Sequence, residues 1–124
     1  IGTFDIVFSN SLLEHVGGHE RRRRLAELVT ASAPRYWVQT PYRYFPVEPH
    51  FVVPGMQFLP LGARAAIAER WHAGPRRLAR ADALTMVEWI ELIGIRQLRS
   101  YFPQADIEIE RLAGLPKSII AVKA

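Results

Sequence analysis

A strand–helix–strand pattern within about the first 40 residues constrains the fold of this chain more than any other feature. Phe4–Phe8 is a short, nearly continuous apolar run, which predicts a strand buried on both faces, as in a parallel sheet. Apolar residues at helical spacing predict an amphipathic helix over Glu20–Ala33, which Pro34 ends. Arg35–Thr40 then reads as a second strand. The pattern therefore predicts a βαβ unit with a right-handed crossover and two parallel strands.

The chain changes character after the second strand. Between Pro41 and Pro60, five prolines and five aromatic residues follow no regular period, which predicts a long loop without secondary structure of its own. Long loops of this kind inside compact domains are usually functional or disordered, and the high apolar content argues against disorder. We therefore expect a loop on the substrate side of the molecule.

The next part of the chain predicts two helices. Ala-rich residues 61–72 form the first, and a basic linker covers 73–80. Thr85 and Glu88 fit a capping box, in which each side chain bonds the backbone of the other at the start of a helix. The helix that they open is expected to end before Gly94, which supplies a left-handed stop.

A closing hairpin is predicted at the end of the chain. Residues 95–102 form a short helix, and strands then cover 107–110 and 118–122. A short connection joins these two strands, so they are expected to pair antiparallel. Parallel strands with a crossover helix and a final antiparallel hairpin place the chain in the α/β class.

Length and composition exclude several kinds of protein. A chain of 124 residues forms at most one domain. No apolar run approaches the roughly 20 residues of a membrane helix, and Asp5 interrupts the apolar start too early for a signal peptide. Cysteine is absent, which excludes disulfides and thiolate metal sites, and a cytoplasmic location is the default expectation. Ile1 at the first position indicates a processed, trimmed or excised piece.

The net charge of +4 comes mainly from arginine, and four arginines stand together from Arg21 to Arg24. Such a run is compatible with a nucleic-acid partner or with a solvated helix face. Acidic residues are spread along the chain, and no aromatic residues interleave with the run as a base-stacking surface requires. We therefore favour the solvated helix face and do not expect nucleic acid as the partner.

Small polar residues follow the first predicted strand directly. Open α/β sheets bind their ligands beside the carboxyl ends of the strands, where Ser9 and Asn10 stand. The same residues could instead form a plain turn that satisfies backbone groups. We expect ligand contact, with Asn10 as the main contributor.

Three segments, in order along the chain, resemble class I S-adenosylmethionine-dependent methyltransferases. Phe4–Val16 is similar to the fourth-strand motif of that family, in which Phe-Asp and apolar residues precede a polar pair and Leu-Glu-His. Thr40–His50 looks like the segment after the fifth strand in a bacterial subgroup, which often has Thr-Pro-Asn where this chain has Thr-Pro-Tyr. Arg111–Ala121 resembles the C-terminal hairpin. The resemblance implies the C-terminal half of a Rossmann-like methyltransferase sheet.

The chain also departs from that family. The glycine-rich loop after the first strand and the acidic residue after the second, which hold S-adenosylmethionine in the family, have no counterpart here. Residues 1–124 are therefore expected to form a single partial domain that lacks the upstream cofactor-binding half and binds the cofactor poorly alone. Its first strand would have an unpaired edge, which is a candidate interface for a homodimer.

The resemblance also assigns candidate site residues. Three of them line the methionine part of the cofactor: Ser9, Asn10 and Ser11. Four residues of the following loop are expected to contact the acceptor: Tyr42, Tyr44, Phe45 and Glu48. The aromatic members of this loop could equally pack the core, because a proline-rich loop also needs apolar anchors.

Two histidines are candidates for catalysis. His15 or His50 could act as a general base on an acceptor hydroxyl, because an unperturbed histidine titrates near about pH 6.5. Related families, among them small-RNA 2′-O-methyltransferases and ubiquinone-pathway O-methyltransferases, bind a divalent metal through Glu-x-x-Glu-His and a later His. Ser11 stands where the first Glu would be, which leaves Glu14 and His15, with Glu48 and His50 as helpers. We expect Glu14 and His15 to hold the turn by hydrogen bonds, without a metal.

The expected function is methyl transfer from S-adenosylmethionine to an oxygen or nitrogen of a small or medium-sized acceptor, such as a sugar or lipid, by the full-length enzyme. The alternative is a non-enzymatic remnant that folds, or assembles by strand exchange, without cofactor. A basic nucleic-acid-binding module is a third reading, which the placement of the arginines in separate helices does not favour.

Overall fold

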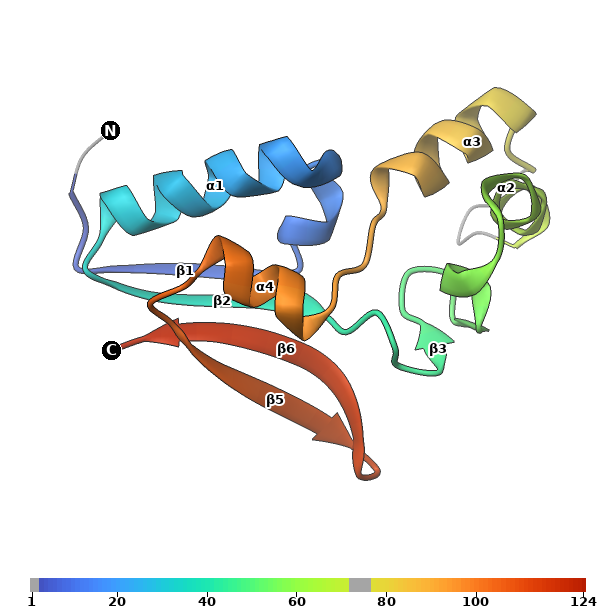
Figure 1. Ribbon diagram of the computed structural model, residues 1–124. Coiled ribbons are helices and arrows are strands. Elements are labelled where there is room, and N and C mark those ends of the chain that lie inside the picture. Colours follow the sequence, from blue (N-terminus) through green and yellow to red (C-terminus); the bar gives the residue numbers. More distant parts are fainter. Residues whose placement is uncertain (1–2, 72–76) are drawn as a thin grey trace.

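The computed structural model describes residues 3–71 and 77–124, and its largest unit is a four-stranded mixed sheet (Figure 1). In spatial order the strands are β1 (Ile6–Asn10), β2 (Arg35–Pro41), β6 (Leu115–Lys123) and β5 (Asp106–Leu112). β1 and β2 are parallel, and β6 runs antiparallel to both β2 and β5. The structure thus confirms the α/β class, with a parallel pair of strands and a closing antiparallel hairpin.

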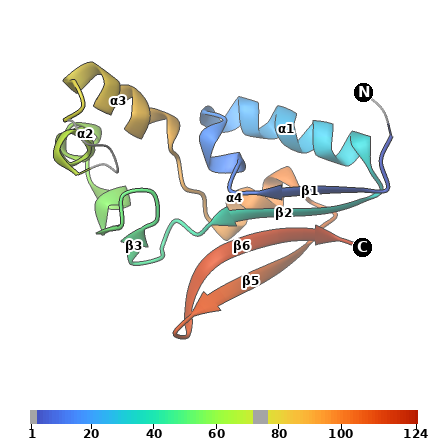
Figure 2. The ribbon, with the colours of Figure 1, turned by 180° about the vertical axis from the view of Figure 1, so that it is seen from behind.

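Two helices pack on the sheet (Figures 1 and 2). α1 (Gly18–Ser32) is the crossover between β1 and β2, and α4 (Ile95–Tyr101) precedes β5. Tyr36 and Val38 of β2 are buried and alternate with half-buried residues, because successive side chains of a strand point to opposite faces. The main core consists of apolar side chains from α1, α4 and the strands, among them Ala26, Val29, Tyr36, Val38, Leu98, Phe102, Ile119 and Ala121.

Between β2 and α4 the chain forms a second lobe, which lies beside the carboxyl ends of β1 and β2 (Figures 1 and 2). Its elements are β3 (Val47–Glu48), β4 (Val53–Pro54), the 3₁₀ turn η2 (Met56–Phe58), α2 (Leu61–Arg70) and α3 (Arg80–Trp89). The lobe has its own core, in which Ala65 and Ala68 of α2 meet Ala83 and Val87 of α3. The small alanine side chains let the two helices approach closely.

The first strand differs from its prediction in position and in burial. β1 begins at Ile6, two residues later than predicted, and extends to Asn10. Phe4, Ile6 and Phe8 are exposed, so the prediction that this strand is buried on both faces is wrong for this chain. The reason is that α1 and α4 share the main core with Tyr36 and Val38, on the other face of the sheet from Phe8 and its partner Trp37. β1 also pairs with β2 and with no other described strand. The predicted unpaired edge is therefore present.

The loop and helix boundaries of the second lobe also differ from the predictions. The loop predicted to lack secondary structure contains the β3–β4 hairpin and η2. Thr85 lies inside α3, where its hydroxyl donates to the carbonyl of Ala81 at 3.0 Å, so the predicted capping box with Glu88 is wrong. Gly94 is extended, with φ −97°, and precedes α4 rather than ending a helix. Residues 72–76, where a helix end and a basic linker are predicted, lie outside the described ranges.

Candidate functional site

Polar side chains gather at the edge of the sheet where β1 and β2 end. The parallel register places Asn10 opposite Gln39, so the chain leaves both strands at the same edge. After β1 it forms the 3₁₀ turn η1 (Leu13–His15), in which Leu13 is fully buried and belongs to the main core. After β2 the β3–β4 hairpin comes back towards η1 and brings His50 against it. Two turns distant in sequence therefore meet beside the strand ends.

Glu14, His15 and His50 form a compact group between these two turns, called here the Glu14–His15–His50 group. The Nε2 atoms of the two histidines are 3.0 Å apart, and their rings are nearly perpendicular, at 89°. Oε1 of Glu14 lies 3.9 Å from each of these nitrogens. The Glu14 side chain is fully buried, whereas that of His15 is 37% exposed. The group is therefore anchored in the interior and open to solvent on the His15 side.

Neighbouring side chains hold two members of the group in place. The Thr40 hydroxyl donates to Oε2 of Glu14 at 2.8 Å. Oε1 of Glu48 lies 2.7 Å from Nδ1 of His50, and the Phe51 backbone N–H donates to Oε2 of Glu48 at 2.7 Å. A carboxylate beside Nδ1 favours the tautomer with its proton on that nitrogen, which leaves the Nε2 lone pair of His50 free. Both Glu14 Oε1 and His50 Nε2 are thus directed into the group.

Two arrangements account for the short distance between the histidines. One is a hydrogen bond between the imidazoles. The other is a shared cation, since two nitrogen ligands about 2.1 Å from one ion are separated by about 3.0–3.4 Å. A hydrogen bond leaves Oε1 of Glu14 without a partner among the described residues, and an unpaired buried carboxylate oxygen is costly. A cation among the three groups would satisfy all of them, so the group could hold a divalent ion.

The donor set narrows the choice of ion. Two imidazoles and one carboxylate suit Zn²⁺ and other first-row transition metals, whereas Mg²⁺ and Ca²⁺ prefer oxygen ligands. Three protein ligands also leave coordination positions open for a substrate, as in catalytic metal sites. Glu48 and Thr40 then act as the outer hydrogen-bonding partners that such ligands usually have. The group could therefore hold a transition-metal ion, whereas the sequence favours a hydrogen-bonded turn.

A pocket of about 450 Å³, called here the aromatic pocket, lies at the same edge of the sheet. Asn10 and Ser11 line it from the end of β1, and Tyr42 and Phe45 line it from the chain after β2. Its polar wall is a hydrogen-bonded set of Gln39, Glu110 and Ser118. The structure thus brings together four residues that the sequence assigns to the cofactor or the acceptor.

A second hollow, of about 580 Å³, runs along β1 and α1 and is called here the β1 hollow. Ser9 lines it together with Asn10 and Ser11, which contribute to both cavities. The Ser11 hydroxyl donates to Oδ1 of Asn10 at 3.1 Å. The Ser9 hydroxyl is buried and has no hydrogen-bond partner among the described residues. Two of the predicted cofactor residues, Asn10 and Ser11, therefore line both cavities. The hydroxyl of the third, Ser9, has no hydrogen-bond partner among the described residues.

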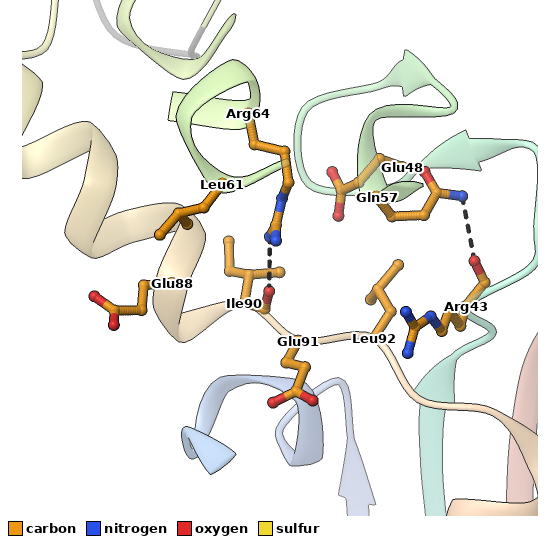
Figure 3. A pocket seen from close by; sticks show the side chains of 9 residues that line it. All are labelled: Arg43, Glu48, Gln57, Leu61, Arg64, Glu88, Ile90, Glu91 and Leu92. Atoms are coloured by element: carbon orange, nitrogen blue, oxygen red, sulfur yellow. Dashed lines mark hydrogen bonds between the residues drawn. The ribbon is translucent and has the colours of Figure 1, made fainter. Parts of the chain in front are cut away.

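Two residues predicted to contact the acceptor lie outside the aromatic pocket. Tyr44 is exposed and stacks on Phe58. Glu48 lies on the wall of a different cavity, of about 320 Å³, whose lining residues all belong to the second lobe (Figure 3). Arg64 reaches across this cavity and donates to the carbonyl of Ile90 at 3.0 Å. Glu48 is buried and bonded to His50, so its observed role is to position that histidine.

Alternation along β3 explains the placement of Glu48. Val47 and Pro49 line the aromatic pocket, whereas Glu48 between them lines the opposite cavity. Successive side chains of an extended segment point to opposite sides, so neighbours in sequence reach different cavities. The sequence shows no strand at this position because two residues are too few for a recognisable period.

Several residues of the site have no counterpart in the sequence predictions. Gln39 and Thr40 lie near the end of β2, at the same edge of the sheet as Asn10. Their position near a strand end is the sequence signal that could have identified both as site residues. Glu110 and Ser118 pair across the β5–β6 hairpin and reach the site because β6 lies beside β2. That strand order involves residues distant in sequence, so local patterns do not reveal it.

Comparisons of the chain with protein-family models, with curated proteins and with solved structures found no match. Among residues 3–71 and 77–124, no helix is long and apolar enough to cross a membrane. The function is therefore argued from the geometry of the Glu14–His15–His50 group and of the two cavities beside it.

Proposed function

We propose that this chain is the acceptor-side half of an S-adenosylmethionine-dependent methyltransferase that acts on a small or medium-sized acceptor. The observation that carries the proposal is the Glu14–His15–His50 group at the carboxyl edge of two parallel strands, next to the aromatic pocket. The strand order β1-β2-β6-β5, in which β6 is reversed, supports the resemblance carried by the sequence motifs. A partial Rossmann-like sheet would present its ligand sites at this edge.

A divalent cation in the group is part of this proposal. Such an ion, when bound, polarises an acceptor hydroxyl and lowers its pKa. Thr40 occupies Oε2 of Glu14, so Oε1 remains for the ion. Glu48 occupies Nδ1 of His50, so Nε2 remains for it as well. The acceptor atom is therefore an oxygen rather than a nitrogen, because a hydroxyl gains most from this polarisation.

The two histidines could also serve as a general base without an ion. In that case His15, the more exposed of the two, takes the proton of the acceptor hydroxyl, and His50 receives part of the charge through the 3.0 Å contact. This role does not use Oε1 of Glu14, which remains unpaired among the described residues. We favour the ion for that reason.

The described residues fit only one edge of S-adenosylmethionine. The free hydroxyl of Ser9 and the polar groups of Asn10 and Ser11 suit the methionine part of the cofactor. Asn10 and Ser11 line both the β1 hollow and the aromatic pocket, whereas Ser9 lines the β1 hollow. When bound, the cofactor supplies an electrophilic methyl group, and the chain's own task is to orient the acceptor and exclude water. Cofactor in the β1 hollow and acceptor in the aromatic pocket would meet at Asn10.

The aromatic pocket suits an acceptor that is partly apolar and carries hydroxyl groups. Tyr42 and Phe45 offer ring surfaces, and Gln39 and Glu110 offer hydrogen-bonding groups on the opposite wall. More than half of the residues that line the pocket are polar, so hydrogen bonds would set the orientation of the ligand.

Calorimetric titration of Zn²⁺ and Mn²⁺ tests the metal centre directly. We expect one ion per chain, and we expect His50→Ala to weaken binding by about 100-fold because it removes one of three ligands. His19→Ala is the matched control, since His19 is exposed on α1 and bonds Tyr101 instead. Equal affinities of the two variants would exclude the metal centre and leave the general-base role.

Titration of S-adenosylhomocysteine tests the methyltransferase assignment separately. It is carried out with this chain and with a longer chain that includes the preceding coding sequence. We expect binding by the longer chain and weak or no binding by the shorter one, since the described residues fit one edge of the cofactor. Failure of both chains to bind would contradict the assignment without affecting the metal centre.

The exposed edge of β1 favours a second candidate function, assembly of two chains through this strand. Ile6 and Phe8 are exposed, and β1 pairs on one side with β2. An exposed apolar edge strand is a template for pairing with another chain. Light scattering after size exclusion would report a dimer, and Phe8→Lys is expected to abolish it, because a charged edge residue blocks such pairing. A monomer at high concentration would exclude this candidate.

A further inference from the structure

The second lobe carries a shallow apolar groove of about 480 Å³ that shares no residue with the Glu14–His15–His50 group. One wall comes from the β3–β4 hairpin and the other from the end of α2. Among the described residues that line it, Arg70 is the one with a charge, and the others are apolar: Val52, Val53, Pro54, Ala66, Ile67 and Trp71. The groove is thus an apolar surface with a cationic group in its lining.

Two large apolar side chains of this groove project into solvent. Val52 is 70% exposed and Trp71 is 64% exposed. Neither belongs to the core of the lobe, so packing among the described residues does not explain why these two positions carry large apolar side chains. Val52 also has φ +56°, in the left-handed region that β-branched residues rarely adopt. Its backbone N–H donates to the Glu48 carbonyl at 2.8 Å, which holds this turn in place.

The net positive charge of the sequence is concentrated in one segment that includes α2. Positions 61–80, which include α2, contain five arginines and one glutamate, a net charge of +4. The rest of the chain contains eleven basic and eleven acidic residues, so this segment accounts for the whole net charge. Glu69 is paired with Arg80 at 2.8 Å, while Arg70 and Arg77 are exposed. An anionic partner is therefore attracted to this lobe.

We propose that the groove is a docking site for an anionic phospholipid surface. Val52 and Trp71 enter the boundary between headgroups and acyl chains, where tryptophan is favoured, and Arg70 in the lining binds a lipid phosphate. A nucleic acid would use the same charge, but it offers no partner for the apolar lining of the groove. The proposal does not depend on metal binding or on methyl transfer, because it rests on a different surface of the molecule.

Sedimentation with phospholipid vesicles tests this proposal. The chain is mixed with vesicles of phosphatidylcholine, either pure or containing phosphatidylglycerol, at low and at moderate salt. We expect binding to the vesicles with phosphatidylglycerol, weakened by salt, and little binding to pure phosphatidylcholine. Equal binding to both kinds of vesicle would overturn the anionic part of the proposal, and no binding to either would overturn it entirely.

Substitutions in the groove distinguish docking there from general attraction to charge. Trp71→Ser is expected to weaken vesicle binding about tenfold, because it removes the largest inserted side chain. Val52→Gly should weaken it about threefold while relieving the backbone strain, since glycine adopts positive φ freely. Arg70→Gln should weaken binding and reduce its dependence on salt.

Leu115→Ser is the matched control, because Leu115 is an exposed apolar residue at the start of β6. The turn between β5 and β6 lies away from α2 in both views (Figures 1 and 2). Leu115→Ser is expected to bind vesicles as the unchanged chain does. If Trp71→Ser and Val52→Gly also bind unchanged, the groove is not the docking site. Binding to a nucleic-acid duplex at the same salt, without binding to vesicles, would assign the basic lobe to nucleic acid instead.

Discussion

The Nε2 atoms of His15 and His50 lie 3.0 Å apart, although 35 positions separate the two residues in the sequence. The contact requires η1 to follow β1 and the β3–β4 hairpin to follow β2, with both strands ending at one edge of the sheet. Glu14, fully buried, completes the group from the side of η1. Most of the following predictions test what this arrangement does.

Glu48→Gln is expected to weaken Zn²⁺ binding by about 10–100-fold, because it removes the negative charge that orients His50 through Nδ1. The side chain keeps its size and can still accept the Phe51 N–H. Calorimetry measures the affinity for Zn²⁺. The control is Glu27→Gln, because Glu27 is an exposed carboxylate of α1 that pairs with Arg23. Unchanged affinity in Glu48→Gln would show that this carboxylate does not prepare His50 for a metal.

Glu14→Gln is expected to raise the stability of the metal-free chain and to remove most of the stabilisation that the metal gives. Without metal it should raise the free energy of unfolding by about 1–3 kcal/mol, because Oε1 of Glu14 is a buried polar atom without a hydrogen-bond partner among the described residues. At a Zn²⁺ concentration of about 100 times Kd, the unchanged chain should gain about 2.7 kcal/mol and the variant little. Urea unfolding with and without Zn²⁺ measures both effects. Parallel responses of the two proteins would contradict the assignment of Glu14 as a ligand.

Tyr36→Phe is expected to raise the free energy of unfolding by about 1 kcal/mol near neutral pH, because it removes a buried hydroxyl that has no partner among the described residues. Burial also raises the pKa of the Tyr36 hydroxyl above its ordinary value of 10.0. The folded state therefore favours the neutral phenol. Below about pH 10 the hydroxyl is neutral in both the folded and the unfolded chain, so this group makes stability independent of pH there. As pH rises from about 10 through the raised pKa, the unfolded chain loses the proton first, and the free energy of unfolding of the unchanged chain falls.

Denaturant titrations at about pH 8 and about pH 11 measure this dependence. The stability difference between Tyr36→Phe and the unchanged chain should grow with pH. A constant difference would mean that Tyr36 ionises alike in the folded and unfolded chains.

Arg22→Ala is expected to lower the free energy of unfolding by about 2–4 kcal/mol, because the Arg22 side chain is 1% exposed and ties α1 to the following segments. Its guanidinium donates to the Tyr101 hydroxyl at 3.1 Å and to Glu91 at 2.9 Å. Glu91→Ala should cost less than about 1 kcal/mol, since its side chain is 45% exposed and water can replace the ion pair. Chemical denaturation of both variants measures the contrast, and equal losses would contradict it.

Local patterns predicted most elements of the fold, because each depends on residues that are near in sequence. The apolar run before Ser9, the helix ended by Pro34 and the final hairpin all have counterparts in the structure. The errors occur where a distant neighbour decides the outcome. Phe8 is exposed because α1 and α4 pack on the other face of the sheet, and Thr85 lies within a helix that packs on α2.

The sequence by itself determined the βαβ unit, the polar residues after β1 and the presence of Glu14 and His15 in the turn that follows. Only the tertiary structure decided that His50 completes this group and that Glu48 turns away from the aromatic pocket to hold it. The physical reason is that periodicity and capping act over a few residues, whereas the meeting of η1 with the β3–β4 hairpin depends on strand register and on packing between distant segments.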